Sequence, residues 1–63
     1  MKKLEVVATG GTNWQLLLDG EFLGTMEFGS IDEEGQYVET DSEVIEYAVE
    51  TFGLADVEAR VVN

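Results

Sequence analysis

The fold is decided by residues 13–28, which read NWQLLLDGEFLGTMEF. Two runs in this stretch alternate apolar and polar residues with a period of two, as half-buried strands do. The runs are separated by Asp19-Gly20, the strongest hairpin signal in the chain. The stretch therefore predicts two antiparallel strands with these apolar residues on one face: Trp14, Leu16, Leu18, Phe22, Met26 and Phe28.

The length of the hairpin loop follows from matching the two apolar faces. A two-residue loop pairs Leu17 with Phe22, which puts the two apolar sets on opposite faces of the sheet. A three-residue loop, residues 18–20, pairs Trp14 with Gly24 and brings both sets to one face. We therefore predict the three-residue loop, in which Gly20 takes the left-handed position of a type I turn with a bulge and the Trp14 ring lies over Gly24.

The segments on either side of the hairpin predict two more strands and an acidic loop. Residues 4–9 alternate apolar and polar side chains, and residues 57–61 do the same. Residues 30–40 are polar and acidic, with a tight turn at residues 32–35. We expect short pairing across this turn from Ile31, Tyr37 and Val38.

A helix is predicted after the acidic loop. Thr40-x-x-Glu43 matches a capping box, in which each side chain accepts a hydrogen bond from the other residue's backbone N–H. Gly53 is placed to end the helix in the left-handed conformation, with Leu54 packing back on it. Helical spacing puts five apolar residues on one stripe: Val44, Ile45, Ala48, Val49 and Phe52.

The predicted fold is a single α+β domain over residues 1–63. Its order is β-β-β-(β)-α-β, giving a small mixed, mostly antiparallel sheet with one amphipathic helix packed on one face. The helical crossover delivers the last strand parallel to an earlier one. In outline this resembles a reduced β-grasp arrangement if the last strand lies beside the first, a likeness of element order that implies no function.

Composition removes several classes of function. The 63 residues include no cysteine and no histidine, so disulfides, thiolate metal sites and the usual general base are missing. Fourteen acids against three basic residues give a formal charge of −11, which opposes direct binding to nucleic acid or an anionic membrane. No apolar run has the length of a transmembrane or signal segment. We therefore expect a soluble, cytoplasmic domain without cofactors.

Catalysis has little support in the sequence. A pair of carboxylates can hydrolyse glycosides, but it needs a cleft and a raised pKa on one partner, for which so short a chain has little room. The serines have no histidine to activate them. Asp32, Glu33 and Glu34 could bind a hard cation, but the alternating ligand spacing of a calcium loop is missing. We predict a protein that is not an enzyme.

The distribution of charge is the most informative feature. No lysine or arginine occurs between Leu4 and Ala59, and all fourteen acids lie in that interval. On a helical wheel, Glu43, Glu46 and Glu50 lie within about 60° of one another, opposite the apolar stripe. No basic residue of the helix offsets their repulsion. We predict that a basic, nucleic-acid-binding protein docks on the following residues: Asp32, Glu33, Glu34, Glu39, Glu43, Glu46, Tyr47 and Glu50.

Two other interpretations stay open. An acidic surface can simply be solvated, as in proteins of high-salt organisms. The domain can also be structural or regulatory, forming a homodimer through its sheet or an edge strand, with acidity serving solubility. For that case, four apolar residues that point away from the helix predict an association patch: Val7, Leu17, Leu23 and Val62.

In size, charge and lack of catalytic residues, the chain resembles the small acidic inhibitors made by bacteriophages and other mobile elements. These include anti-CRISPR proteins, inhibitors of host RNA polymerase and DNA mimics. The resemblance covers overall character and no specific residue pattern. It implies that the negative surface occupies the basic groove of a nucleic-acid-handling protein and blocks it.

Overall fold

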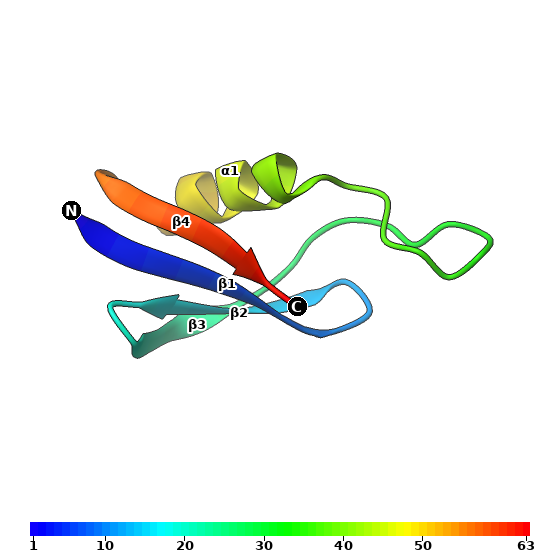
Figure 1. Ribbon diagram of the computed structural model, residues 1–63, viewed down its shortest axis with the longest axis horizontal. Helices are drawn as coiled ribbons and strands as arrows, with labels where there is room; N and C mark the ends of the chain where they lie inside the picture. Colours follow the sequence, from blue (N-terminus) through cyan, green and yellow to red (C-terminus); the bar gives the residue numbers. More distant parts are fainter.

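A four-stranded sheet and one helix make up the computed structural model, which describes residues 1–63 (Figure 1). The strands lie in the order β3-β2-β1-β4, with the two neighbouring pairs β1–β2 and β2–β3 antiparallel and β1–β4 parallel. The predicted α+β class is therefore confirmed, and the last strand lies beside the first. In chain order the elements are β1 (Lys2–Gly10), β2 (Asn13–Leu18), β3 (Glu21–Glu27), α1 (Asp41–Phe52) and β4 (Val57–Val62).

The turn between β2 and β3 has two residues, so the predicted three-residue loop is wrong. Leu18 pairs with Glu21, on either side of the turn. Asp19 (φ 51°) and Gly20 (φ 83°) both lie in the left-handed region, as a type I′ turn requires. Leu23 is an extra residue in β3 that shifts the register by one. Because of this bulge, the apolar residues of β2 and of the second half of β3 point to the same face of the sheet.

This bulge decides which side chains reach the core. Beyond it, Trp14 pairs with Met26, so the predicted contact of its ring with Gly24 is also wrong. The ring that lies over Gly24 is that of Phe52. A Cβ added to Gly24 would come within 2.8 Å of it. Phe22 lies on the other side of the bulge and is 61% exposed. The prediction that Phe22 belongs to the core is therefore wrong.

The helix begins and ends at the predicted residues. Glu43 N donates to Thr40 Oγ1 (3.3 Å) and Thr40 N donates to Glu43 Oε1 (3.1 Å), which completes the capping box. Gly53 (φ 63°) ends the helix, and Leu54 N donates to Val49 O (3.0 Å). No basic residue lies in the last turn, so the helix is held by its caps and its apolar stripe rather than by charge.

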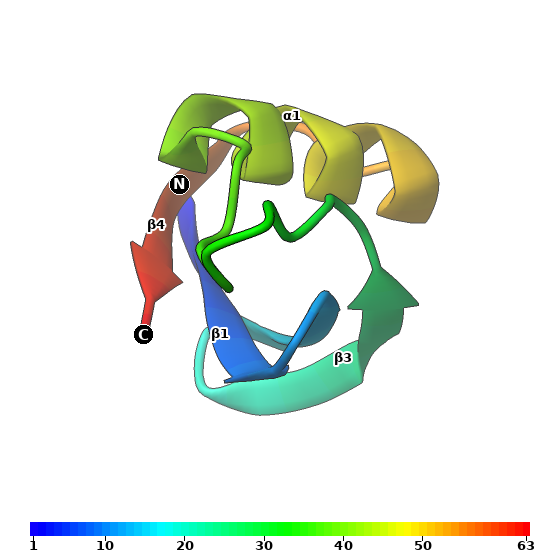
Figure 2. The ribbon, with the colours of Figure 1, turned by 90° about the vertical axis from the view of Figure 1, so that its right-hand side faces the viewer.

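The core is small, as expected for a chain of this length. Two of its residues, Val44 and Ala48, come from the helix and join it to the sheet. In the end-on view of Figure 2 the sheet curves, β3 and β4 rise on either side, and α1 lies across the open side. The buried residues are Leu4, Val6, Trp14, Leu16, Met26, Val44 and Ala48.

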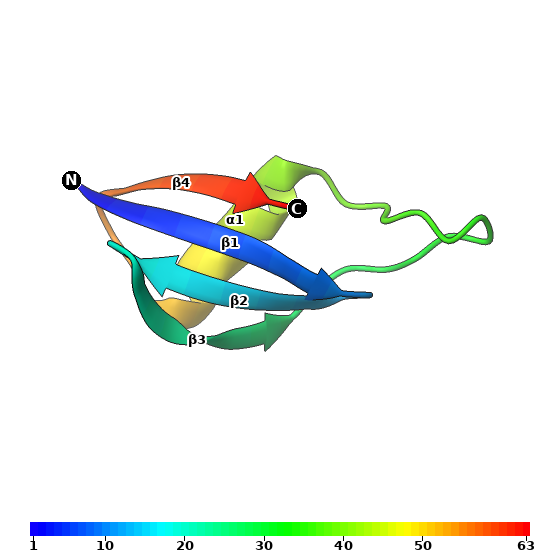
Figure 3. The same ribbon diagram turned by 60° about the horizontal axis from the view of Figure 1, so that its bottom comes forward.

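Residues 28–40 form an arm that projects along the long axis of the molecule (Figure 3). Ile31 and Tyr37 form an isolated antiparallel bridge, and Val38 N donates to Ser30 O (3.0 Å). The predicted pairing across the turn is therefore confirmed, although the optional extra strand is reduced to this one bridge. The arm helps to give the molecule its elongated extents of 38 × 17 × 16 Å.

Candidate functional site

Three glutamate side chains of α1 lie close to two aromatic rings, near the end of β3. Glu43, Glu46 and Glu50 line a hollow of about 220 Å³ together with Phe28 and Tyr47. We call this site the helix hollow. It brings together four of the eight residues that the sequence predicts as partner-binding, and it adds Phe28.

Two stacked rings form part of the helix hollow. The ring centroids of Phe28 and Tyr47 are 4.4 Å apart and their planes differ by 20°. Tyr47 is 38% exposed, so part of its surface remains accessible. Aromatic faces and carboxylates both attract cations, so the hollow suits a lysine or arginine side chain.

A second aromatic pair fixes the position of Phe28. Trp14 Nε1 donates to the Phe28 carbonyl oxygen (3.1 Å), and the Tyr37 hydroxyl donates to the same oxygen. The rings of Trp14 and Tyr37 meet edge to face, with centroids 5.4 Å apart. Gly29 has a φ of 107°, and a Cβ on it would overlap the Tyr37 hydroxyl. Hydrogen bonds and close packing therefore attach this side of the hollow to the sheet.

Tyr37 keeps its proton at neutral pH. Burial is the main cause that raises the pKa of Tyr37 above its ordinary value. Trp14 acts in the opposite direction, and the carboxylates of Glu39 and Glu43 add to the rise. The hydroxyl can therefore remain a hydrogen-bond donor to the Phe28 carbonyl.

The other predicted partner-binding residues lie on the arm, and two of them serve the arm itself. Glu39 accepts hydrogen bonds from Ser30 N (2.8 Å) and from the Ser30 hydroxyl (3.2 Å). Asp32 Oδ1 accepts from the backbone N–H groups of residues 34 and 36, at 2.9 Å each. Glu33 and Glu34 are exposed in the turn of residues 32–35. The arm that carries this turn reaches the end of the molecule far from the N-terminus (Figure 1). No group of three or more acidic side chains is placed to hold a metal ion.

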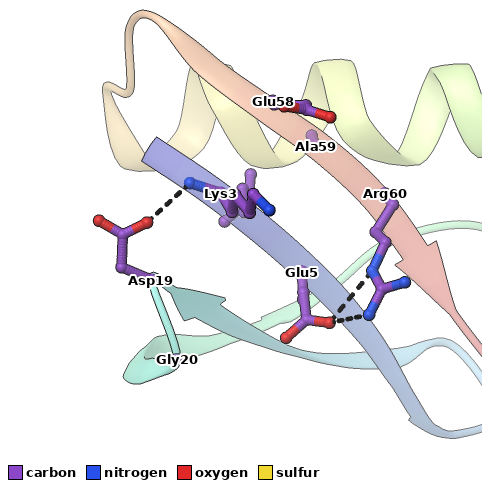
Figure 4. Close-up of a pocket in the computed structure, with 8 residues that line it drawn as sticks. Lys3, Glu5, Asp19, Gly20, Glu58, Ala59 and Arg60 are labelled. Atoms are coloured by element: carbon purple, nitrogen blue, oxygen red, sulfur yellow. Dashed lines mark hydrogen bonds and ion pairs between the residues drawn. The ribbon is translucent and has the colours of Figure 1, made fainter. Parts of the chain in front are cut away.

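The largest hollow lies elsewhere, on the face of the sheet away from the helix (Figure 4). We call this hollow of about 590 Å³ the sheet hollow. Arg60 donates to Glu5 in a salt bridge. The backbone N–H of Lys3 donates to Asp19 Oδ1 (2.8 Å). Charges of both signs therefore meet in the sheet hollow, which is lined by Lys3, Leu4, Glu5, Asp19, Gly20, Glu58, Ala59 and Arg60.

The predicted apolar patch is spread over the same face of the sheet. Val7 pairs with Val62 of β4, while Leu17 pairs with Phe22 of β3. Leu23, the bulged residue, is 37% exposed. Register therefore places two apolar pairs on the helix-free face. One of them includes Phe22, which the alternating pattern assigns to the core.

Comparison with known proteins identifies no relative. No protein-family model, no curated protein and no solved structure matches the chain. The one helix is too short and too polar to cross a membrane.

Proposed function

We propose that the protein is a non-enzymatic binding module that docks its helix hollow on a basic protein. The observation that supports this best is a hollow in which three carboxylates stand beside a stacked aromatic pair. No lysine or arginine between residues 4 and 59 is present to neutralise them. The only salt bridge of the molecule, between Arg60 and Glu5, lies on the other face of the sheet.

Two of the three carboxylates in the helix hollow do not stabilise the fold. Glu46 and Glu50 form no hydrogen bond and no ion pair through their side chains. Like charges at this spacing destabilise a helix by a few tenths of a kcal/mol. Glu50 also lies in the last turns, where the helix dipole disfavours an anion. Glu43 is the exception, because its carboxylate completes the capping box. Charge that opposes folding supports a role in binding.

The partner that we infer is a nucleic-acid-handling protein with a basic groove. Carboxylates spaced along the helix can take the place of backbone phosphates, and Glu33 and Glu34 extend the negative surface to the tip of the arm. The net charge of −11 speeds encounter with a basic surface. Occupying the groove would inhibit the partner, as acidic phage inhibitors of the anti-CRISPR and polymerase-inhibitor types do. We place this action in the cytoplasm.

Capture at low salt tests the proposal. The protein is immobilised and exposed to a lysate of its native host, and the bound proteins are eluted with rising salt. We expect a basic nucleic-acid-binding protein to elute as the salt screens the exposed charges. Added DNA should displace it, because both ligands occupy the same groove. Retention of a partner that DNA does not displace would argue against nucleic-acid mimicry.

A further inference from the structure

We propose that β4 pairs with β4 of a second copy, so that two sheets join edge to edge in a homodimer. This does not depend on the function proposed above. β4 has one hydrogen-bonded neighbour, β1, and no backbone hydrogen bond of a turn, loop or cap reaches residues 57–62. The outward backbone groups of β4 are therefore unpaired, and such an edge can add another strand.

The two edges of the sheet differ in how they are protected. β3 carries the bulge at Leu23, and a bulge interrupts the regular row of backbone groups that a new strand needs. β4 pairs with β1 over six residues without any shift in register. Its sequence, VEARVV, contains no glycine or proline and is rich in valine, which favours strands. β4 is therefore the edge that is open to pairing.

The charges of β4 select one antiparallel register. Opposite residues of two paired strands point to the same face, so identical strands must pair odd residues with odd and even with even. With Ala59 opposite the partner's Ala59, Glu58 faces the partner's Arg60, and Arg60 faces the partner's Glu58. Centring the pair on Glu58 or Arg60 instead places like charges opposite each other, which is unfavourable. The strand is thus complementary to itself about Ala59.

The side chains of β4 are available for this pairing. Figure 4 shows Glu58 and Arg60 on one strand of the sheet hollow. The Arg60 side chain is 73% exposed although it contacts Glu5, so it can bridge Glu5 and the partner's Glu58. On the other face of the strand, Val57 meets the partner's Val61. The dimer would thus add apolar contacts next to a core of only seven buried residues.

A second copy is the occupant that the charge distribution favours. Two chains of charge −11 repel one another wherever acids alone are exposed, as on the flank of α1. The β4 edge lies beside the sheet hollow, where positive and negative side chains occur together. It is therefore a surface on which two copies can approach with opposite charges facing each other.

Two charge variants of the full chain and their mixture test the proposal. E58R makes both charged positions of β4 basic, and R60E makes both acidic. We expect each variant alone to raise the dimer dissociation constant about tenfold or more, because like charges then face each other. An equimolar mixture should associate as a one-to-one heterodimer, since basic strands then face acidic ones. Sedimentation equilibrium measures both effects.

A matched control separates the register from net charge. E33R has the same net charge as E58R but changes the tip of the arm, so it should dimerise like the original chain and should not pair selectively with R60E. Circular dichroism checks that every variant is folded. Among residues 57–61, the backbone amides that point away from β1 should exchange slowly only in the dimer, whereas those bonded to β1 are protected in either state. An original chain that is monomeric at millimolar concentration, or a mixture that associates no better than its components, would overturn the proposal.

Discussion

The helix hollow and the sheet hollow use charge in opposite ways. Three carboxylates of α1 surround the helix hollow without a basic neighbour, whereas in the sheet hollow Arg60 pairs with Glu5. The flank of α1 is positioned by helix caps and aromatic contacts, not by ion pairs. The carboxylates of Glu46 and Glu50 are therefore free to contact a partner, whereas in the sheet hollow Glu5 and Arg60 pair with each other.

The largest expected effect concerns the support beneath the helix hollow. Gly29→Ala should lower the free energy of unfolding by about 2 kcal/mol or more, because its Cβ would overlap the Tyr37 hydroxyl at a positive φ. Gly35→Ala is the matched control, since Gly35 also has a positive φ but open space around it, and should lose about 1 kcal/mol. Urea denaturation measures both. Equal losses would mean that the contact with Tyr37 is not tight.

A smaller effect is expected from the stacked rings of the helix hollow. A double-mutant cycle of Phe28→Ala and Tyr47→Ala should give a coupling free energy of about 1 kcal/mol, as aromatic pairs do. Phe22→Ala serves as the control, because Phe22 lies exposed on the sheet. It should show no coupling with Tyr47→Ala in the same denaturation experiment. Absence of coupling between Phe28 and Tyr47 would contradict the stacked arrangement.

The opposite uses of charge predict opposite signs for two neutralising changes. Glu46→Gln with Glu50→Gln should raise the free energy of unfolding by a few tenths of a kcal/mol, because it relieves repulsion along α1. Glu5→Gln should lower it by under about 1 kcal/mol, because it weakens the salt bridge with Arg60. Both effects should shrink in high salt. If both changes had the same sign at low salt, the two regions would not differ as described.

The smallest effect is a loss of stability in alkali, which does not occur at neutral pH. The raised pKa of Tyr37 means that its protonated form is favoured by folding. This contribution is fully present below the unfolded tyrosine pKa of about 10 and is lost as pH rises through the folded value. Tyr37→Phe should lack this part of the alkaline loss when unfolding is followed from pH 8 to 11. Parallel curves for both proteins would show that Tyr37 has no such role.

Signals that act within a few residues predict the helix well. The capping box of Thr40 and Glu43 and the terminating Gly53 depend only on local chain geometry. Local signals are not sufficient to predict the register of the hairpin. Asp19-Gly20 favours a two-residue turn, while the apolar faces require a shift of one residue. A longer loop and a bulge both satisfy that pattern, and only packing in the finished sheet selects the bulge at Leu23.

The candidate site was predictable to the extent that one helix builds it. The spacing of Glu43, Glu46 and Glu50 places them on one flank from the sequence alone. The contact of Phe28 with Tyr47 was missed, because it depends on where the chain leaves β3; an aromatic residue directly before Gly29 is the only local hint. The hydrogen bonds of the Asp32 and Glu39 carboxylates within the arm depend on its folded path, which residue spacing does not reveal.

Partner affinity, measured against salt for two variants of equal charge, tests directly whether the helix hollow binds the partner. One replaces Glu43, Glu46 and Glu50 with glutamine, which keeps a capping residue at position 43. The control is E21Q/E27Q/D56N, which changes three exposed acids that do not line the helix hollow. We predict that the helix variant loses at least about a hundredfold in affinity at low salt, with a shallower salt dependence, while the control stays within a few-fold. A helix variant that binds with the original affinity and the original salt dependence would show that the helix hollow is not the binding site.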